Sequence, residues 1–204
     1  MNTVLDNVVL EEEKKEEKKA ESAAGDPLAE KFLKTRQILL SGEICEELAE
    51  KTVRQLLILE ADSSEPVYLF IDSPGGDVYA GFAIFDTIRF ISAPVYIVGM
   101  GLIASAAALI LLSVPKERRL GLPNSSYLIH QPSSGMKGVA TDIEIHAAEL
   151  AKTRAKINEI IARQTGTPLE KVSRDTDRDY WLTAEESVEY GLISKVIETR
   201  SELQ

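Results

Sequence analysis

From Phe32 onward, short apolar segments alternate with longer segments in which apolar residues recur every three or four positions. The short segments are rich in Val, Ile and Leu, which is typical of strands that are buried on both faces. Strands that alternate with helices form parallel sheets, because each helix carries the chain back across the sheet. The pattern therefore predicts an α/β domain with a largely buried parallel sheet.

The elements of this domain can be assigned from periodicity and from turn residues. The expected strands are Gln37–Leu40, Val67–Ile71, Val95–Gly99, Ser126–His130 and Ile193–Ile197. The expected helices are Glu43–Glu60, Tyr79–Ile91, Ser105–Leu112, Asp142–Thr165, Leu169–Asp175 and Ala184–Tyr190. Capping boxes are expected at Thr141, Thr167 and Thr183, each followed three residues later by Glu, and left-handed helix ends at Gly166 and Gly191.

Charge and composition exclude several classes of partner. The chain has 33 acidic and 23 basic residues and a net charge of −10, which disfavours binding to nucleic acid. Its longest apolar run, Leu102–Leu112, is too short to span a membrane, and no signal peptide is evident at the N-terminus. A single cysteine, Cys45, fits a reducing compartment. We therefore expect a cytoplasmic location.

Residues 1–30 differ from the rest of the chain because Glu and Lys dominate residues 11–21. Such a block forms either a solvated helix with ion pairs between neighbouring turns or an unstructured acidic tail, and the pattern does not choose between them. We expect two parts: an N-terminal acidic segment, residues 1–30, and one domain, residues 31–204.

Two loops after predicted strands carry residues that suit acyl-transfer chemistry. In Ser73-Pro74-Gly75-Gly76 the glycines let backbone amides face outward, where they can stabilise an oxyanion. Ser105 follows another predicted strand and begins a short apolar helix. Plain turns and packed helices also contain such residues, so neither loop identifies a site by itself.

A serine nucleophile needs a base and an acid that orients the base. Of the two histidines, His130 ends a predicted strand, whereas His146 lies among charged residues of a helix and is expected at the surface. Asp175, Asp177 and Asp179 are candidates for the acid, and their spacing does not decide among them. Asp179 adjoins two aromatic residues and is the one that we expect to turn inward.

Taken together, these segments resemble the proteolytic subunit of Clp protease over Phe32 to Glu198. The matching runs, in the family's order and spacing, are Ser73–Gly76, Ala104–Ser105, Leu122–Ser125, Ile129–Pro132, Ala140–Ile145, Asp175–Asp179 and Glu189–Ile193. The resemblance implies a ClpP/crotonase-type spiral of ββα units, in which a head domain carries a long handle helix at about residues 132–166.

The resemblance also implies the site. Ser105 would be the nucleophile, His130 the base and Asp179 the residue that orients His130. The backbone amides of Gly76 and Ala106 would form the oxyanion hole. No metal or cofactor is implied.

The family's assembly gives further expectations. Two seven-membered rings stack through their handles into a closed tetradecamer, and an AAA+ unfoldase, which hydrolyses ATP, threads unfolded polypeptides into its chamber. The residues that match the ring-to-ring contacts are Ile143, Leu150, Asp177 and Arg178, and those that match the docking pocket for the unfoldase are Phe70, Phe90 and Leu120.

The chain also departs from the family. Ala106-Ala107 stands where Met-Gly is usual after the serine, which predicts an altered preference for the residue before the cut, and Asp72 replaces the usual Asn. Two alternatives to an active endopeptidase remain. One is a structural or catalytically dependent subunit that needs a ClpP paralogue, and the other is a crotonase-like acyl-CoA enzyme, which would not need the three triad residues.

Overall fold

The computed structural model describes residues 27–203 of the chain, which falls into two units, residues 1–36 and 37–204. In the first unit, helix α2 covers Pro27–Leu33. The Glu/Lys block of the N-terminal segment lies outside the described residues, so its conformation and the domain boundary stay predictions. None of the helices between residues 27 and 203 combines the length and the apolar character needed to cross a lipid bilayer.

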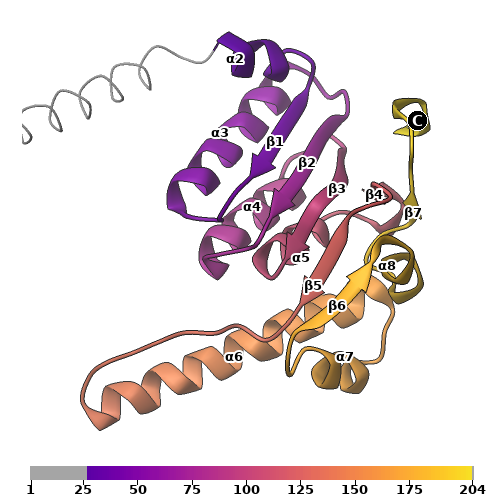
Figure 1. Cartoon of the computed structure of the whole chain (residues 1–204). Coiled ribbons are helices and arrows are strands. Elements are labelled where there is room, and N and C mark those ends of the chain that lie inside the picture. Colours follow the sequence, from indigo (N-terminus) through magenta and orange to yellow (C-terminus); the bar gives the residue numbers. More distant parts are fainter. Residues whose placement is uncertain (1–26, 204) are drawn as a thin grey trace, which may run out of the picture. The chain divides into compact units, whose positions relative to one another are not determined.

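The second unit is built on one seven-stranded sheet (Figure 1). Its parallel part has the order β1 (Gln37–Ser41), β2 (Val67–Ser73), β3 (Val95–Ala104), β4 (Arg119–Gly121) and β7 (Lys195–Val196). β5 (Ser126–Ile129) pairs in parallel with the second half of β3, and β6 (Tyr180–Thr183) pairs antiparallel with β5. The predicted α/β architecture with a mainly parallel sheet is confirmed.

Helices connect the strands and bury their apolar faces. They are α3 (Glu46–Asp62), α4 (Val78–Phe90), α5 (Ala106–Leu111), α6 (Ala140–Thr165), α7 (Leu169–Asp175) and α8 (Ala184–Tyr190), with the 3₁₀ turns η1 (Lys116–Arg118) and η2 (Arg200–Leu203). Every residue of α5 is buried. This short helix therefore lies in the core, and the residue that precedes it is held by the packing of the whole sheet.

The structure corrects some details of the sequence-based assignment. Strands β4 and β6 were not expected. β4 has only three residues, including Arg119 and Gly121, and therefore carries no hydrophobic pattern. Only Thr183 forms a capping box; α6 begins after Val139 and α7 after Pro168, and neither residue caps its helix with a side chain. The left-handed helix ends at Gly166 and Gly191 are confirmed.

Helix α6 corresponds to the predicted handle, and Figure 1 shows it extending beyond the sheet with the connection from β5 running beside it. Its two halves differ in burial. Ile157 and Ile161, in the second half, are buried, whereas Ile143 in the first half is 45% exposed and Leu150 is half-buried. The subunit therefore packs only one half of the apolar stripe and leaves the other half uncovered.

Candidate active site

The candidate site lies at one edge of the sheet, where three strands end. The turn at Pro74–Gly76 follows β2, Ser105 follows β3 and His130 follows β5. Because these strands are parallel neighbours, their carboxyl ends meet at the same edge. The fold thus brings together three segments that are far apart in the sequence.

Ser105 sits on a sharp turn between β3 and α5. Its backbone has φ 56° and ψ −118°, a conformation that costs a non-glycine residue energy and is common at functional sites. The Ser105 N–H donates to the carbonyl of Leu128 in β5 at 2.9 Å, which ties the turn to the neighbouring strand. The flanking sequence lacks the Gly-x-Ser-x-Gly signature, yet the geometry is a strained strand-to-helix turn of the kind found there.

His130 is paired with Asp179 as the resemblance implies. The His130 Nδ1 atom lies 3.0 Å from Asp179 Oδ1. The imidazole is 26% exposed and the carboxylate 62% exposed, so Asp179 is not turned inward as its aromatic neighbours suggested. With Nδ1 occupied by the carboxylate, Nε2 is the ring nitrogen left for proton transfer.

The other two acidic candidates are engaged elsewhere. Asp175 accepts from Lys171 at 2.6 Å and from the Tyr190 hydroxyl at 2.9 Å. Asp177 pairs with Arg154 of α6 at 2.9 Å. Of the three aspartates, Asp179 is therefore the one that pairs with His130, which the spacing alone did not indicate.

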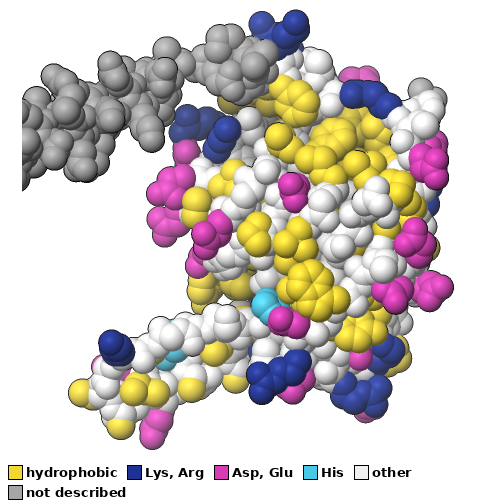
Figure 2. Space-filling model, viewed as in Figure 1, with side chains coloured by type: hydrophobic (Ala, Val, Ile, Leu, Met, Phe, Trp, Pro, Cys, Tyr) yellow, Lys and Arg dark blue, Asp and Glu magenta, His cyan; other side chains and the backbone are white. Residues whose placement is uncertain are grey.

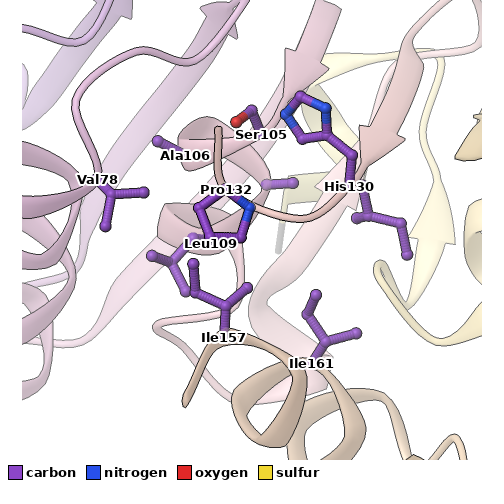
Figure 3. Close-up of a pocket in the computed structure, with 10 residues that line it drawn as sticks. Val78, Ser105, Ala106, Leu109, His130, Pro132, Ile157 and Ile161 are labelled. Carbon is purple, nitrogen blue, oxygen red and sulfur yellow. The ribbon is translucent and has the colours of Figure 1, made fainter. Parts of the chain in front are cut away.

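Ser105 and His130 line one small pocket, and Figure 3 shows their side chains next to each other at its rim. The rest of the pocket is apolar: Val78, Ala106, Ala108, Leu109, Ile129, Pro132, Ile157 and Ile161. In the described part of the chain, the Ser105 hydroxyl and the His130 imidazole are not joined by a hydrogen bond. Such bonds are often long in unliganded enzymes and tighten when substrate binds.

The turn that carries Gly76, one of the two residues expected at the oxyanion hole, lies beside Ser105. Gly75 packs so closely against Ser105 that a Cβ atom added to Gly75 would lie 2.7 Å from the Ser105 Cβ. Ile44 holds the turn from outside, since its N–H donates to the Gly75 carbonyl at 2.8 Å and its carbonyl accepts from Asp77 N–H at 2.8 Å. Within the described part of the chain, no hydrogen bond uses the Gly76 N–H. Ala106, the first residue of α5, has no acceptor for its N–H within the helix.

A second pocket adjoins the first and is lined in part by His146, which was expected at the surface. Ser105 and Gly76 line it together with His146, whose Nε2 lies 2.9 Å from Ser134 Oγ. His146 is half-buried rather than freely solvated. No sequence pattern indicated that His146 lies near Ser105, because the segment between β5 and α6 that brings it there has no regular structure.

The residues expected at ring contacts lie on the surface of this subunit. Arg178 is exposed, as are Asp177 and Ile143. The carboxylate of Asp177 is already paired with Arg154 inside the subunit. A contact between rings through Asp177 therefore has to share or replace that pair.

Two of the three residues expected at the docking pocket, Phe70 and Leu120, belong to one apolar cluster. Figure 2 shows hydrophobic side chains gathered on this face of the molecule. Leu120 is buried in a cluster against which Phe70 packs, and Phe90 is 82% exposed. Leu203, near the C-terminus, packs on the same cluster. The sequence did not reveal Leu203, because an isolated Leu in a polar tail carries no pattern.

Comparison with known proteins agrees with this geometry. Residues 19–200 match the Clp protease family. The chain is 65% identical to the ATP-dependent Clp protease proteolytic subunit 2 of Treponema denticola over 179 residues, which cover 87% of this chain and 90% of that protein. It is 44% identical to proteolytic subunit 3 of Rhizobium etli over 194 residues, covering 95% and 100%.

A solved structure of a ClpP1 mutant from Listeria monocytogenes superposes with a TM-score of 0.81 at 45% identity, covering 87% of this chain and 99% of that one. The ClpP fold that the sequence predicted is thus confirmed. These matches favour a peptidase over the acyl-CoA enzyme that was also considered. By sequence and by fold, this chain belongs to the Clp protease family.

Proposed function

We propose that this chain is the proteolytic subunit of an ATP-dependent Clp protease and that it cleaves peptide bonds as a serine endopeptidase. Ser105 is the nucleophile, His130 the general base and Asp179 the residue that orients the imidazole. The observation that carries the proposal is the 3.0 Å pairing of His130 with Asp179, next to a serine on a strained turn that lines the same pocket.

The chemistry follows from these positions. When substrate binds, His130 Nε2 accepts the proton of the Ser105 hydroxyl while the oxygen attacks the peptide carbonyl carbon. The backbone amides of Gly76 and Ala106 donate to the oxyanion of the tetrahedral intermediate. The imidazolium then protonates the leaving amine, and water releases the acyl group from Ser105 by the reverse proton path. Asp179 stabilises the imidazolium in both halves of the reaction.

The apolar pocket beside Ser105 suits the side chain of the residue before the cut. Ala106, a small residue, lines the pocket next to Ser105. The cavity of about 20 Å³ holds roughly one water molecule. A compact apolar side chain therefore fits with less rearrangement than an aromatic one. Cleavage of a peptide library that is indifferent to the size of this residue contradicts the assignment.

The assembled form is a stack of two heptameric rings, a tetradecamer in the cytoplasm. The uncovered half of the α6 stripe, with Ile143 and Leu150, supports contact between the rings, since burial of apolar side chains stabilises association. Phe70, Phe90 and Leu120 form the docking region for an AAA+ unfoldase that delivers unfolded polypeptides. The second candidate is a structural or catalytically dependent subunit of a mixed complex with a ClpP paralogue, and the numbered names of relatives, subunit 2 and subunit 3, favour such a complex.

The test is hydrolysis of a fluorogenic peptide by the wild type and by Ser105→Ala, each alone and with the paralogue. We expect Ser105→Ala to lose at least about a thousandfold in kcat, as other enzymes lose when the nucleophile is removed. Ser126→Ala, at an exposed serine of β5, is the matched control and keeps full activity. Wild-type hydrolysis by Ser105→Ala in both arms rules the proposal out.

A further inference from the structure

The pairing of His130 with Asp179 joins two segments that are separated by 49 residues in the sequence. Both residues lie just beyond the end of the β5–β6 ladder, whose last pair is Ile129 with Tyr180. Asp179 is 62% exposed, so burial does not hold its carboxylate in place. Some other contact has to fix the far side of the pair.

Gln131 provides that contact. Its backbone N–H donates to the carbonyl of Thr176 at 2.6 Å, and its side-chain Nε2 donates to the carbonyl of Asp177 at 2.6 Å. The residue after His130 is thus attached at two points to the segment that leads into Asp179. The ladder pair on one side and Gln131 on the other bracket the His–Asp pair.

The segment that Gln131 grips is itself anchored. Thr176 is fully buried, and its hydroxyl contacts Asn158 Oδ1 of α6 at 3.0 Å and the Val172 carbonyl of α7 at 2.9 Å. Asn158 is also buried. Gln131 therefore connects the loop that carries the imidazole to a rigid part of the core rather than to a free loop.

We propose that Gln131 is a positioning residue for catalysis, which keeps His130 and Asp179 in register through the hydrogen bond from its side-chain amide to the Asp177 carbonyl. This inference rests on the proposed function. Gln131 lines neither of the two pockets at Ser105, so it acts through the His–Asp pair and not on the substrate. Its loss should change the chemical step and leave substrate binding unchanged.

Gln131→Met tests the proposal, because Met has a similar length and no donor, while the backbone bond to Thr176 remains. We expect kcat for a fluorogenic peptide to fall roughly tenfold with KM unchanged. A looser carboxylate stabilises the imidazolium less, so the acid limb of the pH profile of kcat/KM should move to lower pH. Gln55→Met, at a half-buried glutamine of α3, is the matched control and keeps the wild-type profile.

Gln131→Ala removes the same donor with a smaller side chain and should show the same two changes if the Met variant does not assemble. A wild-type kcat and pH profile in a folded variant overturns the proposal, as does a loss of kcat with no movement of the acid limb. If Ser105→Ala still cleaves the peptide, the proposed function itself has failed. If Ser105→Ala is inactive while Gln131→Met matches the wild type, only the role of Gln131 is wrong.

Discussion

Arg119 is the largest fully buried side chain in the described part of the chain, and its hydrogen bonds all go to uncharged oxygen atoms. Its guanidinium donates to the carbonyl of Val114 at 2.9 Å, and to the carbonyl and side-chain oxygen of Gln164 at 3.0 Å each. Burial lowers the pKa of Arg119 to about 10, which leaves it charged at neutral pH. One side chain thus joins β4, the segment after α5 and the end of α6.

Replacing Arg119 with Met keeps most of the apolar stem and removes every donor. A buried carbonyl that loses its donor costs about 1–3 kcal/mol, and two short bonds to main-chain carbonyls are lost. The bonds to the carbonyls of Gly191 and Leu192 are longer, at 3.2 and 3.5 Å, and add less. The variant also avoids the desolvation cost of burying the guanidinium charge, which offsets part of this loss of stability. We expect a net decrease of about 2–4 kcal/mol in the free energy of unfolding.

Urea denaturation measures this difference, provided that all variants are compared at one subunit concentration, because association contributes to stability. Arg54→Met is the control, since Arg54 is exposed and, within residues 27–203, its ion pair is with Glu50 on the same helix. That variant should stay within about 0.5 kcal/mol of the wild type. An Arg119→Met variant as stable as the control refutes the reasoning about the buried guanidinium.

Three further predictions follow from other buried or crowded positions. Burial raises the pKa of Tyr127 to about 12 from 10.0, so the folded state keeps a proton that the unfolded state releases. The contribution of the protonated Tyr127 to the free energy of unfolding is complete below pH 10 and is lost as the pH rises to 12. In Tyr127→Phe, the free energy of unfolding measured with urea should therefore fall less steeply between pH 10 and 12. Gly75→Ala should lower peptidase activity at least tenfold by displacing Ser105, whereas Gly42→Ala, at the same φ of 91° with no atom near the added methyl group, should not; equal activities contradict this. Leu203→Asp should uncover the apolar cluster and increase the fluorescence of a bound apolar dye, and an unchanged signal means that Leu203 does not cover it.

The parallel sheet could be predicted from sequence because its strands are rich in Val, Ile and Leu, although β1 and β2 leave one face partly exposed. Val67–Ser73 and Val95–Ala104 are examples, and their ends were misjudged only by the residues that lead into the site. β4 could not be predicted in this way. Arg119 is polar and Gly121 has no side chain, and their places in the sheet depend on partners in α6 and β5.

The candidate site was predictable in part for a similar reason. Ser105 follows one predicted strand and His130 ends another, so their meeting at one edge follows from the parallel pairing of these strands. The choice of Asp179 needed the resemblance to the family or the structure, because Asp175 and Asp177 offer the same chemistry at similar spacing. Gln131 lies in the run Ile129–Pro132 that matches the family, but its proposed role could not be predicted, since that role consists of two contacts to the backbone of Thr176 and Asp177.

In the proposed mechanism, His130 activates the Ser105 hydroxyl. Reaction of the assembled protein with a fluorophosphonate, followed by intact-mass and peptide mass measurement, tests it directly, because the reagent labels only an activated serine. We predict one adduct per active subunit, located on Ser105, and loss of that adduct in His130→Ala. An adduct on another serine, or equally fast labelling of Ser105 without His130, contradicts the claim.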